Sequence, residues 1–188
     1  MEPILSSFLL VAVSEMGDKT QLLAFSLATR YRRPWVVMGG ILTATLLNHA
    51  LAAGVGTWVS SHVPPRIMAA VLAGVFIAFG LWTLKPDELA EKPKVERFGP
   101  FVTTAVLFFI AEMADKTQLA TVALGARYHS IVLVTIGTTL GMLVSDGLAV
   151  FLGERLARHV SMAWIRLGAA GLFLAFGAAS AWKALRFA

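Results

Sequence analysis

The chain has 188 residues, of which 57% are hydrophobic and 14% charged, with a mean hydropathy of +0.75. This composition excludes an ordinary soluble domain. The net charge is +5, but the basic residues form no stripe interleaved with aromatic residues, so nucleic-acid binding is not expected either. The sequence contains no cysteine, which excludes disulfides and thiolate metal sites. We expect an all-α membrane protein.

Mostly apolar residues fill almost the whole chain. A membrane-spanning helix needs about 20 of them, and six windows qualify: 4–28, 35–59, 66–84, 100–124, 131–153 and 161–183. No Lys or Arg precedes Lys19, so the N-terminus lacks the basic region of a cleaved signal peptide and the first helix should be retained. The pattern predicts six transmembrane helices.

The first window contains the charged stretch Glu-Met-Gly-Asp-Lys-Thr-Gln at residues 15–21. A charged residue at the centre of a bilayer costs roughly 2.5 to 3.5 kcal/mol on insertion scales, so buried carboxylates in such a helix indicate an ion pathway. The second window carries Asn48 and His49 near its middle, and the third carries no acidic residue. Residues 85–99 form the only long polar segment.

The second half of the chain repeats the first at a constant offset of 97 residues. Residues 112–118 read Glu-Met-Ala-Asp-Lys-Thr-Gln, and the offset also links Pro3 to Pro100 and Arg30 to Arg127. We expect a first three-helix repeat at 1–84, a polar cytoplasmic linker at 85–99 and a second three-helix repeat at 100–188, together one membrane domain. Because three is odd, the two repeats should be inverted relative to each other, as in many secondary transporters.

The basic residues between the windows predict an orientation. Nine lie on the side that holds the linker, including Arg155 and Arg158 in an expected loop between the fifth and sixth helices, and four lie on the other. By the positive-inside rule the richer side is cytoplasmic, so both termini should lie outside.

The two motifs should form one site. On continuous helices, residues 15, 18 and 19 would share one face, and so would their counterparts in the second copy. Inverted symmetry would then bring together carboxylate oxygens, which suit Ca²⁺, Mg²⁺ or Mn²⁺. The expected metal ligands are Glu15, Asp18, Glu112 and Asp115. With two lysines, Lys19 and Lys116, as charge-balancing or coupling groups, the site sums to minus two, which one divalent cation neutralises.

Further polar residues are weaker candidates for this site. Gln21 and Gln118 follow the motif acids, while Asn48 and Asp146 lie in the middle of apolar windows. The role of His49 stays open. A simpler interpretation, in which each lysine pairs with the glutamate four residues earlier in its own helix, would leave Asp18 and Asp115 unexplained.

The doubled motif, placed on the first and fourth of six short helices, resembles the signature of the Gdt family of cation/proton exchangers. That family includes Golgi calcium and manganese transporters and bacterial manganese exporters such as MneA. The resemblance covers essentially the whole chain and implies export of Mn²⁺, with Ca²⁺ as a further candidate, through the four motif acids. One residue departs from the pattern: Ala114 stands at the motif glycine of the second copy.

The expected function is therefore secondary transport of a divalent cation in exchange for protons, without a cofactor and without enzymatic chemistry. The alternatives are an exporter of amino acids or other small cationic solutes, and an intramembrane enzyme that uses the carboxylates as acid and base. The expected location is a bacterial inner membrane. The sequence leaves open the choice between Mn²⁺ and Ca²⁺, coupling to H⁺ or Na⁺ and its stoichiometry, and the oligomeric state.

Overall fold

The computed structural model describes residues 1–85, 98–113, 115–159 and 162–186, with only the backbone described for 153–159 and 162. These residues form eight α-helices and no strand. The helices are α1 (Glu2–Glu15), α2 (Lys19–Tyr31), α3 (Pro34–His62), α4 (Pro65–Thr83), α5 (Pro100–Glu112), α6 (Lys116–Tyr128), α7 (Ile131–His159) and α8 (Met162–Arg186). The all-α prediction is confirmed.

For two of the six predicted helices, the prediction of one continuous helix is wrong. The window 4–28 is divided between α1 and α2, and the window 100–124 between α5 and α6, with both breaks inside the charged motif. The fifth window is also longer than predicted, because α7 continues to His159 and so includes Arg155 and Arg158. Almost all of the predicted linker lies outside the described residues.

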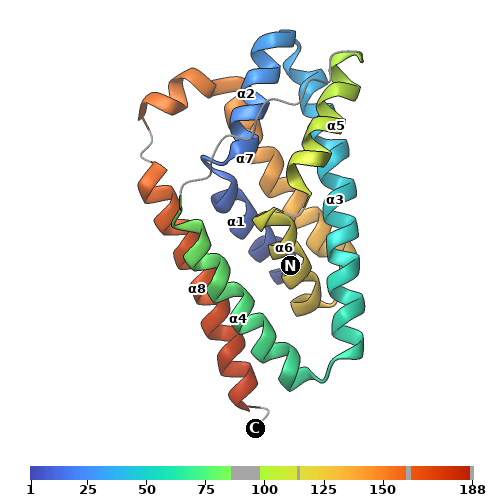
Figure 1. Cartoon of the computed structure of the whole chain (residues 1–188), viewed down its shortest axis with the longest axis vertical. Helices are drawn as coiled ribbons and strands as arrows, with labels where there is room; N and C mark the ends of the chain where they lie inside the picture. Colours follow the sequence, from blue (N-terminus) through green and yellow to red (C-terminus); the bar gives the residue numbers. More distant parts are fainter. Residues whose placement is uncertain (86–97, 114, 160–161, 187–188) are drawn as a thin grey trace.

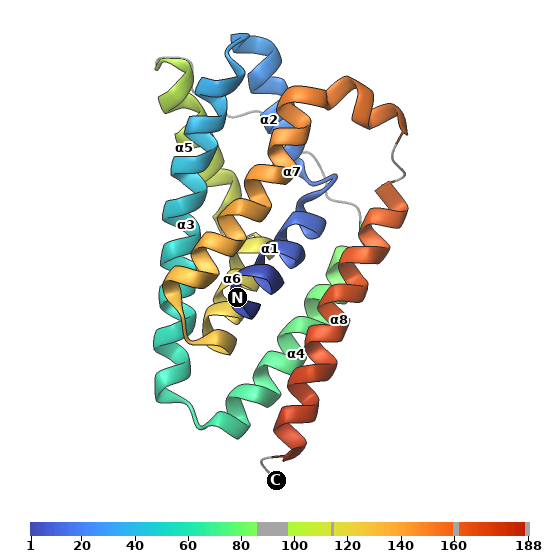
Figure 2. The same cartoon turned by 180° about the vertical axis from the view of Figure 1, so that it is seen from behind.

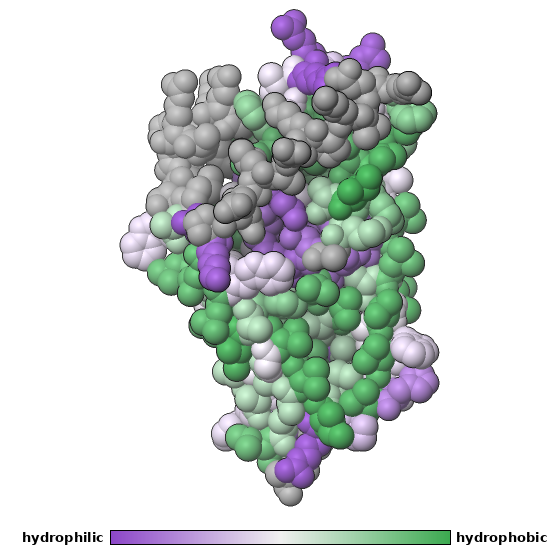
Figure 3. Space-filling view, in the orientation of Figure 1, coloured by the Kyte–Doolittle hydropathy of each residue, from purple (hydrophilic) through white to green (hydrophobic). Residues whose placement is uncertain are grey.

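Among the described residues, four helical segments are long and apolar enough to cross a membrane: α3, α4, residues 131–152 of α7 and residues 163–186 of α8. The helix α5 is apolar but shorter. In the view of Figure 3 the surface below the grey atoms is largely hydrophobic, with hydrophilic side chains toward the two ends and in a patch directly below the grey atoms. These features identify a membrane protein.

Exposed tryptophans lie near both ends of the long helices. Trp35 and Trp58 of α3 are 23 residues apart, and Trp164 and Trp182 of α8 are 18 apart; all four are between 60% and 76% exposed. At 1.5 Å per residue these spacings are about 34 and 27 Å, close to the thickness of a bilayer core. Because tryptophan prefers the membrane–water interface, these spacings fit helices that cross a bilayer.

The broken helices pack across the two halves of the chain (Figures 1 and 2). The first pair, α1 and α2, packs mainly on α7, while the second pair, α5 and α6, packs mainly on α3. The remaining helices, α4 and α8, pack against each other at one side of this bundle. Each half therefore supplies the long helix that supports the broken helix pair of the other half.

Helix bounds and close contacts recur at the offset found in the sequence. The starts of α2 and α6, of α3 and α7, and of α4 and α8 all differ by 97 residues. A Cβ on Gly40 would lie 2.8 Å from the carbonyl oxygen of Phe101, and one on Gly137 would lie 2.5 Å from that of Ile4. Both glycines thus let a long helix approach the backbone of the other half's broken helix.

Candidate divalent-cation site

Each motif forms a short extended break between two helices. After α1, Met16 is extended, Gly17 has a φ of 82°, and Asp18 begins α2 by accepting a hydrogen bond from its first amide, Lys19 N, at 2.6 Å. After α5, Met113 and Asp115 have nearly the same backbone angles as Met16 and Asp18. Aspartate is a preferred N-cap, which explains why a helix restarts directly after it. Ala114 lies outside the described residues.

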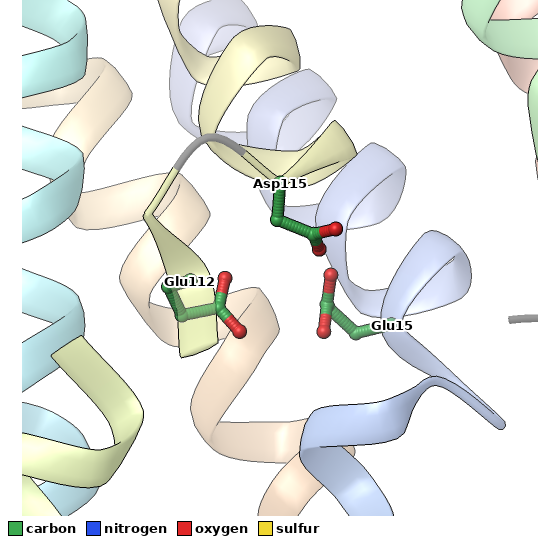
Figure 4. A group of neighbouring side chains, drawn as sticks. All are labelled: Glu15, Glu112 and Asp115. Carbon is green, nitrogen blue, oxygen red and sulfur yellow. The ribbon is translucent and has the colours of Figure 1, made fainter. Parts of the chain in front are cut away.

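The breaks bring carboxylates of both motifs together (Figure 4). One oxygen from each of Glu15, Glu112 and Asp115 can be chosen so that all three lie within 4.8 Å of one another. Glu15 and Glu112 are completely buried and Asp115 is 7% exposed. Asp18, 1% exposed, lies at the start of α2 beside them. The breaks thus bring together at least three of the four acids predicted as ligands.

The partial charges of the broken helices add to this arrangement. The carboxyl ends of α1 and α5 meet the site and carry partial negative charge, while the amino ends of α2 and α6 carry partial positive charge. Half-helix ends of this kind bind ions in several transporters. The arrangement can therefore coordinate a cation with oxygen ligands from both halves.

The two lysines pair across the motifs. Lys19 Nζ lies 2.9 Å from Asp115 Oδ1, and Lys116 Nζ lies 3.0 Å from Asp18 Oδ2. The predicted face shared by residues 15, 18 and 19 is wrong, as is that of the second copy, because each helix ends at the glutamate and a new one starts at the lysine. The crossed ion pairs hold the two breaks against each other.

Two threonines belong to the site although they were not among the predicted site residues. The hydroxyl of Thr20 donates to Glu15 Oε2 at 2.9 Å, and the hydroxyl of Thr117 donates to Glu15 Oε1. Neither carboxylate oxygen of Glu112 has a hydrogen-bond partner within the described part of the chain. The sequence signal that could have identified the two threonines is their position directly after Asp-Lys in both copies of the motif.

The weaker candidates line the same region. Gln21 accepts from Gly17 N and donates to the Ser145 carbonyl, both at 2.9 Å, and so joins the first break to α7. Asn48 of α3 donates to the Phe109 carbonyl of α5 at 3.1 Å. Gln118 is half-buried.

Asp146 and His49 occupy equivalent positions of α7 and α3. Both are fully buried, and neither has a hydrogen-bond partner among the described residues. Asp146 is close enough to Glu15 and Asp18 for their charges to interact. A buried carboxylate without a donor is costly unless a proton or a cation accompanies it, so Asp146 belongs with the candidate ligands.

The chain is similar to known transporters over almost its whole length. The family model described as "Divalent cation/proton antiporter GDT1" matches the chain twice, at residues 3–91 and 100–187. A protein of Vibrio cholerae named "Putative manganese exporter" is 43% identical, with 96% of this chain and 91% of that protein aligned. No solved structure matches.

More distant relatives extend to photosynthetic organisms. A GDT1-like protein of Synechocystis is 30% identical over 94% of this chain and 95% of its own length. GDT1-like protein 3 of Arabidopsis thaliana is 28% identical over 95% of this chain and 70% of its own length. The family is one of transporters rather than enzymes. With its doubled match and its paired acidic helix breaks, the chain belongs to the GDT1 family of divalent cation/proton antiporters.

Proposed function

We propose that this protein exports Mn²⁺, with Ca²⁺ as a further substrate, in exchange for protons through the acidic site between the two helix breaks. The observation that carries the proposal is the buried cluster of Glu15, Glu112 and Asp115, whose oxygens come from both halves of the chain. The name of the Vibrio cholerae relative favours Mn²⁺. Hard oxygen ligands suit both ions.

Ligand roles follow from the contacts. Asp115 uses Oδ1 for Lys19, while its Oδ2 and both oxygens of Glu112 accept no hydrogen bond from any described residue. These oxygens are therefore the ones most available to a cation. Asp18 completes the four acids, with Asp146 and the side-chain oxygens of Gln21, Gln118 and Asn48 as further candidates. Lys19 and Lys116 balance the charge and fix the distance between the breaks.

Proton exchange follows from the charge of the empty site. Four motif carboxylates and two lysines sum to minus two, and moving that charge through an apolar environment costs several kcal/mol per ion. Protonation of about two carboxylates would remove this cost. We propose exchange of about two protons per divalent cation, slowed by low cytoplasmic pH, with a third proton if Asp146 takes part.

The finer architecture belongs to the same proposal. Each broken pair, α1 with α2 and α5 with α6, counts as one span, which gives six spans in two inverted three-helix repeats. The recurrence of the helix bounds at an offset of 97 residues and the double family match support this duplication. The proposed repeats are 1–84 and 100–188, with 85–99 as cytoplasmic linker, both termini outside and the chain in a bacterial inner membrane.

Alternating access would come from a movement of the packed helix pair α4 and α8. Met68, Leu72 and Phe76 of α4 and Phe173 of α8 share one core cluster with α6. Among the described residues, the cluster formed by α2, α3, α5 and α7 contains none from α4 or α8. We propose that the pair of α4 and α8 closes one side of the site in this structure. After the pair has moved, it would close the opposite side. The unequal packing of two otherwise equivalent clusters supports this.

The decisive experiment measures Mn²⁺ and Ca²⁺ flux in proteoliposomes that carry a pH-sensitive dye, under imposed pH or Na⁺ gradients and with the membrane potential clamped. We expect cation flux with opposite proton flux. Flux driven only by Na⁺, or cation flux without proton flux, would contradict the mechanism. Labelling of both termini from outside intact cells, with linker labelling only after permeabilisation, tests the orientation.

A further inference from the structure

A cavity away from the acidic site is lined by residues from the C-terminal part of α8, among them Lys183 and Arg186. It has a volume of about 440 Å³, is open on one side, and is lined by residues of α4, α8 and the ends of α3 and α6. Its lining has two parts. Met68, Ala69 and Leu72 of α4 form an apolar wall, and Arg127, Lys183 and Arg186 bring positive charge to the same space.

One of these arginines is held firmly in place. Arg127 Nη1 donates to Ser180 Oγ at 2.8 Å, and its guanidinium lies over the rings of Phe176 and Tyr128 at 4.9 and 5.5 Å. Its Nε is buried and has no acceptor among the described residues. None of the described residues that line the cavity is acidic. The cavity therefore presents uncompensated positive charge, which disfavours a cation and favours an anion.

The tryptophans near the cavity indicate which kind of anion it could bind. Lys183 directly follows Trp182, and Ser60, also in the lining, is two residues after Trp58. Because tryptophan prefers the membrane–water interface, basic side chains beside Trp58 and Trp182 suit the level of lipid phosphates, and the apolar wall of α4 suits acyl chains.

We propose that this cavity binds an anionic phospholipid, with the phosphate between Arg127, Lys183 and Arg186 and part of an acyl chain against Met68 and Leu72. Because α4, α6 and α8 all line the cavity, the bound lipid would lie beside the packed pair of α4 and α8. This site is independent of the cation-transport proposal, since none of its residues is a predicted cation ligand.

The test uses the purified full-length protein in native mass spectrometry, titrated with phosphatidylglycerol or phosphatidylcholine. The variant K183Q/R186Q removes two exposed charges but keeps Arg127 and its packing. The control R32Q/R33Q removes two exposed charges from the connection between α2 and α3, which lies at the opposite end of the molecule from the C-terminus (Figure 1). Each basic residue near a membrane surface contributes about a fivefold gain in affinity for anionic lipid, so phosphatidylglycerol should bind about 25-fold more weakly to K183Q/R186Q.

We expect R32Q/R33Q to bind phosphatidylglycerol like the parent protein. Equal losses in the two variants, or phosphatidylcholine binding as tight as phosphatidylglycerol, would overturn the proposal. A third variant, Ala69→Phe, fills the apolar part of the cavity and should bind phosphatidylglycerol more weakly than the parent protein does. If inorganic phosphate displaced phosphatidylglycerol at comparable concentration, the cavity would be an anion site without a lipid component, and the assignment would be wrong.

Discussion

The two copies of the motif contain the same acids and lysines in different surroundings. Glu15 accepts hydrogen bonds from Thr20 and Thr117, whereas Glu112 has no hydrogen-bond partner among the described residues. The side chain of Lys19 is 26% exposed and that of Lys116 only 5%. An arrangement of two equivalent halves would be equally open to both sides of a membrane. Under the proposed alternating access, such a difference between the copies is expected in either of the two access states.

The largest expected effect comes from removing the charge of either glutamate. Glu15→Gln and Glu112→Gln should each abolish Mn²⁺ transport in proteoliposomes, because each removes a ligand charge at nearly constant volume. If the halves are functionally equivalent, the two losses should be of similar size despite the different hydrogen bonds. Glu2→Gln, at an exposed position, is the control. Near-native transport by either site variant would refute a shared site.

The lysines should differ in their effect on stability. Lys116→Met leaves Asp18 charged and buried, and breaking such a pair costs about 3 to 5 kcal/mol. Lys19→Met should cost less, because the more exposed Lys19 is partly solvated. Thermal unfolding in detergent measures both, and Asp18→Asn added to Lys116→Met should restore much of the loss. Equal losses for the two single variants would show that the difference in exposure has no energetic consequence.

The close-approach glycines test the equivalence of the halves in the scaffold. Gly40→Ala and Gly137→Ala should each destabilise the protein by about 1 to 3 kcal/mol, because the new methyl group meets backbone in both cases. Gly54→Ala is the control, since nothing lies within 4 Å of its Cβ position, and it should be neutral or stabilising by up to about 1 kcal/mol. Thermal unfolding in the same detergent gives all three values. Strongly unequal losses at Gly40 and Gly137 would contradict the repeat.

The smallest effects should come from the threonines. Thr20→Val and Thr117→Val each remove one hydrogen bond to Glu15, worth about 1 kcal/mol, and should change the apparent affinity for Mn²⁺ by about fivefold. The concentration dependence of Mn²⁺ uptake measures this change. Thr121→Val is the matched control, because its hydroxyl donates only to a carbonyl of its own helix at 2.8 Å. An effect of Thr121→Val as large as that of Thr117→Val would remove the threonines from the site.

Much of this arrangement could be predicted from the sequence. The long helices α3, α4, α7 and α8 follow from uninterrupted apolar windows, and the constant offset pointed to one site formed by two motifs. The breaks were missed because an apolar window was taken as one helix, although Gly17 followed by the N-cap Asp18 is a termination and start signal. The second copy has no glycine there. The crossed lysine pairs depend on tertiary contact, which spacing along one helix cannot reveal.

The packing of each broken helix pair on the long helix of the other half has a consequence for biogenesis. When the ribosome has completed α1 to α4, the partner of α1 and α2 does not yet exist, so the first half enters the membrane with its packing surface uncovered. Tertiary folding must then wait for α7, the next-to-last helix to be synthesised. Such long sequence separation between contacting elements slows folding. For the same reason, the two halves expressed as separate chains should need each other to become stable.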